Sequence, residues 1–305
     1  MCSSDLVVSR GAAFFDLDRT LLAGASGEVF SRAMREAGLV RAIPGESLLY
    51  RLFNTVGETL PSMALARQAA TLAKGRPQAA VRAAAEAAAD ELLGLVHASV
   101  TGLVAAHRAA GRPVVLATTT PLDLVEPLVR RLGFDDVVAT RYGVNADGTY
   151  DGTIAGHFVW SQGKLAAIRE WAEANGVDLS MSHAYSDSVF DTPMLAAVGH
   201  PHVVNPDPRL SLVAAARRWP VLDLAAGEVP HPDQEGDSSM ARIPVVNMEI
   251  QRLALALLHP SLFPYVRFEV SGTERIPTSG PAILVGNHRS YFDPVAVAKI
   301  GRAHV

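Results

Sequence analysis

The chain has 305 residues, of which 49% are hydrophobic and 19% charged, which excludes disorder and leaves ample apolar material for a core. Its 27 basic and 31 acidic residues give a net charge of −4, with no basic excess to indicate a nucleic-acid partner. Cys2 is the one cysteine, so a disulfide framework and a cysteine-based zinc site are excluded. No uncharged apolar run reaches the roughly 18 residues of a membrane span, and the N-terminus lacks a secretory signal pattern. We therefore expect a soluble, cytoplasmic chain, or one that only touches a membrane surface.

The first part of the chain predicts one strand followed by a long helical stretch. An apolar, β-branched-rich run from Val7 to Phe15 predicts a buried strand that ends at a polar sequence, residues 16–20. Apolar residues at helical spacing then predict helices at Glu28–Leu39, Ser47–Val56, Pro61–Lys74 and Pro77–Ala110. Because this stretch is too long for one crossover between strands, we expect a separate helical cap at about residues 25–108.

Strand and helix patterns alternate over the next hundred residues. Short strands are predicted at 113–117, 137–139, 183–185, 203–204 and 221–222. Helices are predicted at Leu122–Leu132, Lys164–Asn175 and Asp191–Val198, and a hairpin turn at Asn145–Gly148. This alternation predicts an α/β fold with a doubly wound parallel, Rossmann-like sheet over residues 7–223, into which the cap is inserted.

A linker and a second unit follow this domain. Residues 224–242 are rich in Gly, Pro, Asp, Glu and Ser without periodicity, which is typical of a linker. The second unit begins at residue 243 with an amphipathic helix, Val246–Leu258, and strand patterns at Val266–Val270 and Ala282–Val285. Two interpretations of the helix stay open: it rests on a bilayer surface, or it packs on its own domain.

Both termini look foreign to the protein. Residues 1–6 and 300–305 resemble translations of opposite strands of a common short-read sequencing adapter. Our hypothesis is that these segments, with Cys2 and His304, are not native and that the chain is a fragment of a longer gene product. Ordinary frayed termini are the alternative. Resequencing the source gene decides between them, because a native stop codon directly after Val305 contradicts the hypothesis.

Polar residues follow three of the predicted strands. Asp16 and Asp18 follow the first, Thr118 follows the second, and Asp187 with Asp191 follows the strand at 183–185. The carboxyl ends of parallel strands meet at one edge of the sheet, so these side chains should converge. Converging carboxylates repel, so that one takes a proton or a hard cation lies among them. With only oxygen ligands present, Mg²⁺ is the expected ion.

A carboxylate at such a site can also act as a nucleophile and form an aspartyl phosphate. That chemistry needs a metal to neutralise the phosphoryl oxygens, a cation and a hydroxyl to hold them, and an acid for the leaving group. Lys164, which begins a helix between the second and third polar strand ends, supplies the cation. The sequence thus contains every group that the chemistry requires.

With these motifs in order, residues 10–223 resemble the haloacid dehalogenase superfamily of phosphohydrolases, in its phosphoserine-phosphatase-like branch, subfamily IB. The resemblance makes Asp16 the nucleophile and Asp18 the general acid and base. It makes Thr118 the phosphate-binding hydroxyl and Lys164 the lysine that steadies the phosphoryl group. It also implies that Mg²⁺ is held by Asp16, Asp187 and the main-chain carbonyl of Asp18, with Asp191 in support.

The chain departs from this family at two positions. Arg19 stands where the superfamily often has a small residue, and either shapes the substrate pocket or is solvated. A glutamate that phosphoserine phosphatases carry near the start of the cap falls at Ala25, and Glu28 is out of register. The second departure leaves the phosphatase chemistry intact but counts against phosphoserine as the substrate.

A second motif lies near the C-terminus, where His288 and Asp293 follow a strand pattern. A histidine base oriented by a carboxylate can deprotonate a hydroxyl. Residues 243–299 resemble the start of the 1-acylglycerol-3-phosphate acyltransferases, and the resemblance makes His288 the base and Asp293 the residue that orients it. A histidine that caps a helix is the alternative. The family's later motifs are absent, so we expect this chain to hydrolyse a phosphomonoester but not to transfer acyl groups.

These inferences predict a Mg²⁺-dependent phosphomonoester hydrolase that forms the N-terminal half of a bifunctional enzyme of phospholipid biosynthesis. The expected substrate is a small phosphorylated metabolite or a lysophospholipid. Acyl-CoA or acyl carrier protein is the expected donor in the full-length protein, with peripheral contact to the inner face of the membrane. Two alternatives stay open: acyl transfer is the main activity and the hydrolase domain is accessory, or that domain is a non-catalytic binding module. The intact Asp16 and Lys164 argue against the last.

Overall fold

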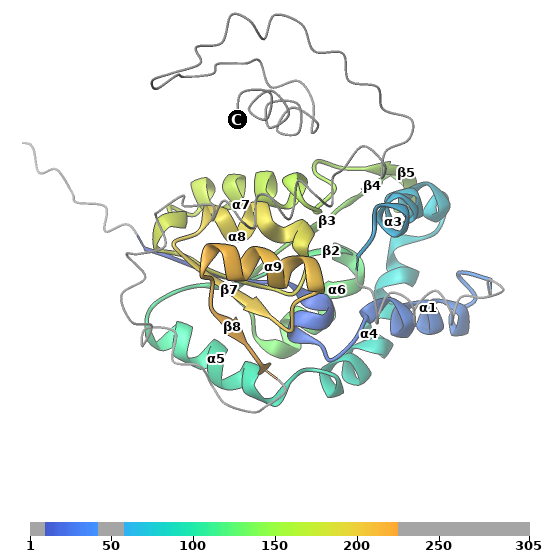
Figure 1. Cartoon of the computed structure of the whole chain (residues 1–305). Coiled ribbons are helices and arrows are strands. Elements are labelled where there is room, and N and C mark those ends of the chain that lie inside the picture. Colours follow the sequence, from blue (N-terminus) through green and yellow to red (C-terminus); the bar gives the residue numbers. More distant parts are fainter. Residues whose placement is uncertain (1–9, 42–57, 225–305) are drawn as a thin grey trace, which may run out of the picture. The chain divides into compact units, whose positions relative to one another are not determined.

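The computed structural model describes residues 10–41 and 58–224, all within the first of the chain's two units, residues 1–241. In these residues six strands form a parallel sheet in the order β3-β2-β1-β6-β7-β8 (Figure 1). They are β1 Ala13–Phe15, β2 Val114–Pro121, β3 Asp136–Thr140, β6 His183–Ser186, β7 His200–Val204 and β8 Val221–Leu222. The predicted α/β class with a doubly wound parallel sheet is confirmed.

Strand β1 lies at the centre of the sheet, between β2 and β6. Phe14 is paired in register with Val115 on one side and with Ala184 on the other. The strand is fully buried because its residues, Ala13 to Phe15, are all apolar. The chain passes from β1 to β2 and β3 on one side and returns to β6 on the other. The carboxyl end of β1 is therefore the switch point at which open α/β sheets bind their ligands.

Helices cover both faces of the sheet. One face carries α5 (Ala98–Ala109) and α6 (Leu122–Leu132), and the other carries α7 (Gln162–Ala174), α8 (Thr192–Ala197) and α9 (Pro208–Arg217) (Figure 1). Side chains of β1 alternate between the two layers: Phe15 shares a core with Leu103 and Leu128, and Phe14 shares the other with Ile168. Burial on both faces explains why the strands are continuous apolar runs in the sequence.

Three described helices precede α5 between β1 and β2: α1 (Ser26–Glu36), α3 (Leu60–Ala73) and α4 (Gln78–Gly94). Thr59 and Ser62 begin α3 with a reciprocal capping box, in which each side chain accepts from the other residue's backbone N–H. Helix α4 packs along α6, where Glu86 pairs with Arg130 and Arg131. This packing fixes the inserted helices against the sheet domain.

The helical segment predicted as continuous from Pro77 to Ala110 is two helices. The chain breaks between Gly94 and Ala98, because its backbone there bonds to the segment that leaves the sheet: Ala23 N donates to Leu95 O at 2.9 Å and His97 N to Leu21 O at 3.0 Å. Helix α5 beyond the break belongs to the layer on the sheet. The helices that lie apart from the sheet thus end near Gly94 rather than near residue 108.

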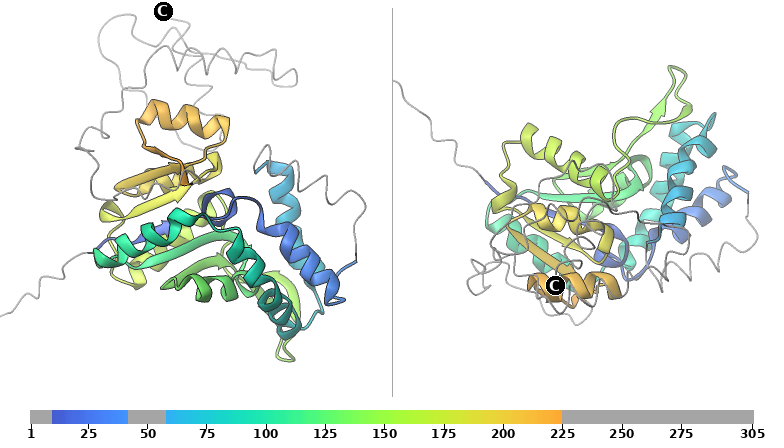
Figure 2. Two further views of the ribbon diagram at one scale, coloured as in Figure 1. Left: turned by 90° about the horizontal axis from the view of Figure 1, so that it is seen from below. Right: turned by 45° about the horizontal axis from the view of Figure 1, so that its top comes forward.

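A two-stranded hairpin, β4 (Tyr142–Val144) and β5 (Tyr150–Ile154), surrounds the turn predicted at Asn145–Gly148. Its backbone bonds to the connection between α3 and α4: Tyr150 N donates to Arg76 O at 3.0 Å, and Gly75 N donates to Tyr150 O at 2.8 Å. Figure 2 shows the hairpin beside α3. Through this hairpin the second half of the sheet domain reaches across to the inserted helices.

The other strands and helices predicted within the described ranges are present, with shifted ends: the strand predicted at Val7–Phe15 is described as a strand only at Ala13–Phe15, and the helix predicted to end at Leu39 ends at Glu36. The helix predicted at Leu122–Leu132 ends at Gly133, whose φ of +67° is the left-handed conformation that favours glycine at this position. Predictions for residues 1–9, 42–57 and 225–305 lie outside the described residues; they include the helices at Ser47–Val56 and Val246–Leu258 and both acyltransferase residues, His288 and Asp293.

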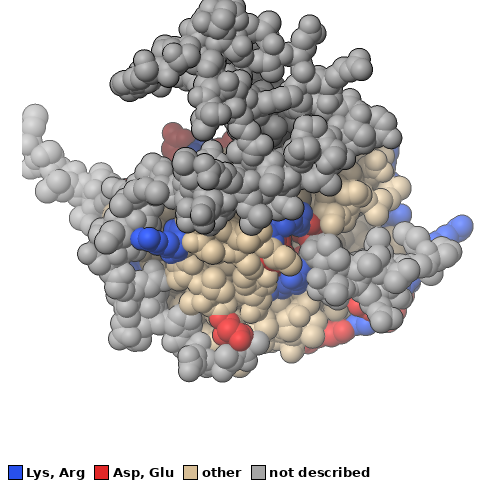
Figure 3. Space-filling model, in the orientation of Figure 1, with Lys and Arg blue, Asp and Glu red and all other residues tan. Residues whose placement is uncertain are grey.

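On the face shown in Figure 3, acidic and basic side chains of the described residues are interspersed among uncharged ones. This distribution agrees with the small net charge of −4. Among the described helices, none has both the length and the apolar character needed to cross a bilayer.

Three buried histidines lie close together: His183 at the start of β6, His202 in β7 and His107 in α5. His183 and His202 stack with ring centroids 5.3 Å apart, and His183 Nδ1 lies 3.0 Å from His202 Nε2. His107 Nε2 lies 2.8 Å from the Tyr185 hydroxyl. Burial, followed by the charges of the neighbouring histidines, holds the pKa of His183 far below its ordinary value. His183 is therefore neutral in the folded protein at any physiological pH.

This histidine should make the fold sensitive to acid. Below about pH 6.5 an unfolded chain protonates this residue while the folded chain does not, so the free energy of unfolding falls as the pH falls. One such group contributes a slope of up to about 1.4 kcal/mol per pH unit. Urea unfolding between about pH 5 and 8 should show a smaller slope in His183→Phe, which keeps a stacked ring. The more exposed His157→Gln is the control, and equal slopes in His183→Phe and the unmodified chain would contradict this assignment.

Candidate functional site

The site is built around a buried lysine at the carboxyl edge of the sheet. Lys164, in the first turn of α7, is 1% exposed. Its Nζ donates to Asp16 Oδ1 at 2.8 Å and to Asp191 Oδ2 at 2.7 Å. Ser186, the last residue of β6, donates from its hydroxyl to the same Asp191 oxygen at 2.8 Å. The structure thus brings together three residues predicted for the site, Asp16, Lys164 and Asp191, from three separate elements.

The charges of this cluster depend on one another. Burial alone would lower the pKa of Lys164, but the charges of Asp16 and Asp191 outweigh it, so the pKa lies above its ordinary value. The lysine is therefore a permanent cation. Burial raises the pKa of Asp16, and the lysine opposes that rise. The charge of Lys164 therefore favours the carboxylate form of Asp16, although burial still keeps the pKa of Asp16 above its ordinary value.

Asp18 and Thr118 lie beside this cluster, on the turn after β1 and at the end of β2. The Asp18 carboxyl accepts hydrogen bonds from the Ser26 backbone N–H and from the Thr120 side chain. Burial raises the pKa of Asp18 despite these bonds, which suits a group that carries a proton. The Thr118 hydroxyl is 1% exposed and accepts from Thr120 N at 3.1 Å. Both residues thus lie at the predicted edge of the sheet.

The turn after β1 also holds the acidic loop that follows β6. The Thr20 hydroxyl donates to Asp187 Oδ1 at 3.1 Å and accepts from Asp187 N at 3.0 Å. Arg19, with a φ of +61°, places its Nε 3.4 Å from Asp187 Oδ2. Burial raises the pKa of Asp187 to about 8, although Arg19 lowers it. Arg19 is thus largely buried and paired with Asp187 rather than solvated.

Four predicted metal ligands, Asp16, Asp18, Asp187 and Asp191, lie on the turn after β1 and the loop after β6. Within the described ranges no three acidic or histidine side chains converge as a ready-made cage. The donor chemistry nevertheless fits a hard cation, because burial, and after it the charges of neighbouring carboxylates, raise the pKa values of Asp16 and Asp187. Asp191 Oδ1 is buried and has no hydrogen-bond partner among the described residues. These residues therefore fit a hard cation such as Mg²⁺.

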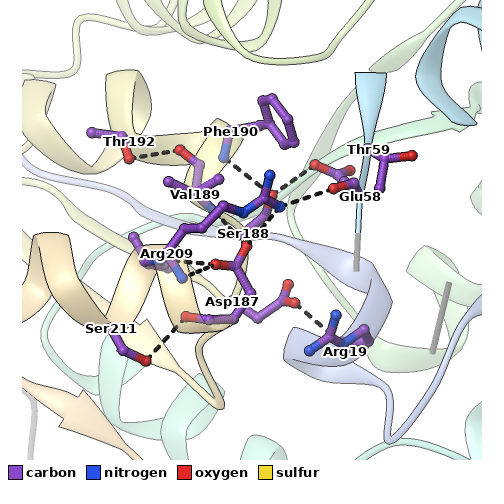
Figure 4. A network of polar contacts seen from close by, with 12 residues as sticks. Arg19, Glu58, Thr59, Asp187, Ser188, Val189, Phe190, Thr192, Arg209 and Ser211 are labelled. Atoms are coloured by element: carbon purple, nitrogen blue, oxygen red, sulfur yellow. Dashed lines mark hydrogen bonds and ion pairs between the residues drawn. The ribbon is translucent and has the colours of Figure 1, made fainter. Parts of the chain in front are cut away.

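Glu58, which reaches the site from the residues just before α3, was not among the predicted site residues. Its Oε2 accepts from the Ser188 hydroxyl at 2.7 Å (Figure 4). The same oxygen accepts from Trp160 Nε1 at 3.1 Å. Arg209 of α9 donates to the Glu58 main-chain carbonyl at 3.0 Å and lies over the Phe190 ring. Glu58 precedes a helix and belongs to none of the four motifs, so no pattern along the chain could find it. It connects the inserted helices to the acidic loop.

The structure also shows where Ala25 lies, the residue that stands in place of the glutamate of phosphoserine phosphatases. Ala25 lines a cavity beside Asp18, whereas Glu28 is exposed and does not line it. Ala25 is therefore part of the cavity wall, and the side chain of Glu28 does not take the place of the glutamate that phosphoserine phosphatases have there.

Comparison with known proteins agrees with this geometry. The haloacid dehalogenase-like hydrolase family matches residues 13–196, a range that includes Asp16, Thr118, Lys164 and Asp191. The chain belongs to this family of hydrolases. The acyltransferase family matches residues 267–304, which lie outside the described residues and include His288 and Asp293.

Individual relatives extend over most of the hydrolase domain. A probable phosphatase of Mycobacterium tuberculosis is 36% identical over 264 residues, which cover 84% of this chain and 91% of the relative. A phosphoserine phosphatase of the same species is 34% identical over 217 residues, 70% of each chain. A solved structure of a protein of unknown function from Bordetella pertussis is 30% identical, with a TM-score of 0.60, and covers 71% of this chain and 99% of its own.

Proposed function

We propose that the chain is a Mg²⁺-dependent phosphomonoester hydrolase that acts through an aspartyl phosphate on Asp16. The observation that carries this proposal is the buried Lys164, which bonds both Asp16 and Asp191 at the carboxyl edge of the sheet. Membership of the hydrolase family and a relative named as a probable phosphatase support it. A small phosphorylated metabolite or a lysophospholipid is the proposed substrate.

The proposal assigns a residue to each step of the hydrolysis. Asp16 attacks phosphorus, and the bond between phosphorus and the ester oxygen breaks while Asp18 gives its proton to that oxygen. Lys164 and the Thr118 hydroxyl hold the phosphoryl oxygens during the transfer. Asp18, now a carboxylate, then takes a proton from the water that attacks the aspartyl phosphate. Inorganic phosphate leaves, and both carboxyl groups return to their first state.

The proposed ligands of the ion are Asp16, Asp187 and the main-chain carbonyl of Asp18, with Asp191 in support. When bound, Mg²⁺ neutralises charge on the phosphoryl oxygens and on the nucleophile. Thr20 and Arg19 orient Asp187 in the structure as it stands. These contacts give the loop after β6 a fixed place beside Asp16.

Metal titration tests this assignment. Phosphate release should require added Mg²⁺ after treatment with a chelator. In Asp187→Ala, the Mg²⁺ concentration for half-maximal activity should rise by about 10- to 100-fold, because a charged ligand is lost. Asp147→Ala, in the exposed hairpin turn, is the matched control. A metal response in Asp187→Ala equal to that of the control would show that Asp187 is not a ligand.

We also propose that residues 243–299 contribute to acyl transfer, with His288 as base and Asp293 as the residue that orients it. The acyltransferase family match at 267–304 favours this second function. The helix predicted at Val246–Leu258 supports peripheral contact with a bilayer, and acyl-CoA or acyl carrier protein is the proposed donor. The test is transfer to lysophosphatidic acid by a protein in which these residues are followed by the family's later motifs. Activity that persists in His288→Ala would contradict the role of His288.

A further inference from the structure

A cavity of about 320 Å³ lies beside Asp18, between α1, α3 and the end of β2. Its described wall is largely apolar and includes Phe30, Met34, Val40, Met63, Leu124 and Phe158. A water molecule occupies about 30 Å³ in the liquid, so the cavity has room for about ten groups of methylene size. This is more than the leaving group of a three-carbon metabolite needs.

The charges in this wall are of one sign. The ionisable side chains among the described lining residues are Asp18, Glu58 and Tyr142, and none is Lys, Arg or His. Burial raises the pKa of Tyr142 to about 12, so its phenol is neutral. Glu58 accepts from Ser188 and Trp160, which are neutral donors. A carboxylate on the leaving group would find no cation to pair with among the described lining residues, at a large desolvation cost.

The position of the cavity beside Asp18 indicates which part of the substrate it would hold. Asp18, the proposed proton donor to the leaving oxygen, and Thr120, which bonds to it, both line the cavity. The side of the substrate that receives the proton from Asp18 therefore faces the apolar wall. The phosphoryl group lies on the other side, at Lys164.

We infer that the leaving group is an uncharged, largely apolar alcohol, so that the substrate class is the monophosphate ester of a long-chain or lipid alcohol. This inference rests on the proposed phosphatase function and assigns its specificity. The products are inorganic phosphate and the free alcohol, whose hydroxyl proton comes from Asp18. Both n-alkyl phosphates and lysophosphatidic acid have this chemistry, and the second adds a glycerol backbone between the phosphate and the chain.

The test compares kcat/KM for n-alkyl phosphates from ethyl to dodecyl, kept below their micelle concentrations, with phosphoserine and lysophosphatidic acid. We expect kcat/KM to rise about fourfold per methylene until the cavity is filled, because each buried methylene contributes about 0.8 kcal/mol. Phosphoserine should be hydrolysed more slowly than propyl phosphate. The propyl leaving group has the same number of carbon atoms but lacks the ammonium and carboxylate groups of serine. A higher kcat/KM for lysophosphatidic acid than for the alkyl phosphate of equal chain length would identify a lipid phosphate, rather than a simple alkyl phosphate, as the substrate.

A pair of variants tests whether the alkyl chain of the substrate lies in the cavity. Ala66 of α3 lines the cavity, whereas Leu65, its neighbour, is 49% exposed and does not. Ala66→Phe should stop the rise of kcat/KM at a shorter chain than in the unmodified protein, and Leu65→Phe should leave the chain-length profile unchanged. Identical profiles in the two variants would place the alkyl chain elsewhere and overturn the inference.

The alkyl phosphate series on the unmodified protein distinguishes failure of the inferred substrate class from failure of the proposed phosphatase function. Hydrolysis of all these esters with no dependence on chain length, or a preference for phosphoserine, overturns the inference and leaves the phosphatase function standing. No hydrolysis of any ester in the presence of Mg²⁺ overturns the proposed function, and the inference with it.

Discussion

Asp16→Asn is expected to abolish phosphate release, with a loss of several orders of magnitude in kcat. The amide is nearly the same size as the carboxylate and can still accept a hydrogen bond from Lys164, which lies 2.8 Å from Oδ1 in the unmodified chain. It cannot form an acyl phosphate, because it has no anionic oxygen to attack phosphorus. The measurement is steady-state phosphate release, with substrate and Mg²⁺ in excess over the enzyme.

Chemical trapping adds a direct readout. Borohydride reduces an acyl phosphate to an alcohol, so a chain quenched during turnover should carry homoserine at position 16 by mass spectrometry. Asp90→Asn, the same chemical change at an exposed position of α4, should keep both the activity and the trapped product. A mutant at Asp16 that retains most of its turnover would exclude the covalent mechanism. Trapping at another carboxylate would move the nucleophile to that residue.

The carboxyl edge of the sheet could be predicted because each of its strands carries its own signal. Apolar runs that end in Asp16, Thr118 and Ser186 are local patterns, and parallel pairing then forces their ends together. Lys164 could be placed because a helix begins just before it. These residues are predictable because the neighbouring sequence indicates both the strand or helix to which each belongs and its position there.

Glu58 and the break before α5 could not be predicted, for the same physical reason. Apolar spacing continues from Leu92 through Val96 to Val100, so the sequence has no signal of the break. The chain breaks there because residues 95 and 97 bond to backbone groups some seventy residues earlier in the chain. Glu58 likewise depends on Ser188 and Trp160, which are distant in sequence. Tertiary contacts, rather than local propensity, decide both features.

The contacts of Glu58 also couple the inserted helices to the acidic loop. Arg209 bonds the main chain of Glu58 and stacks on Phe190, while Ser188 of the same loop bonds the Glu58 side chain. Asp207 accepts from the Val189 backbone N–H at 3.1 Å and fixes the loop from the opposite side. A change in the position of α3 would therefore disturb these contacts with the loop that carries Asp187.

Lys164→Met is expected to affect both stability and catalysis, because the lysine is the shared counterion of Asp16 and Asp191. Methionine fills a similar volume but leaves two buried carboxyl groups without a cation, and breaking a buried ion pair in this way typically costs about 3–5 kcal/mol. For a domain of this size, the melting temperature should fall by about 2–4 °C for each kcal/mol lost. Catalysis should fall as well, since the cation that holds the phosphoryl oxygens is removed.

Two further variants identify the cause of that loss. Lys74→Met, the same change at an exposed position, should leave the melting temperature nearly unchanged. Adding Asp191→Asn to Lys164→Met should recover part of the stability, because it removes one of the two uncompensated charges while Ser186 can still bond the amide oxygen. The melts are compared with a chelator present, so that a bound ion does not replace the lysine. If the double variant were no more stable than Lys164→Met alone, lost packing rather than lost charge would explain the effect, and Lys164 would not be the electrostatic centre of the site.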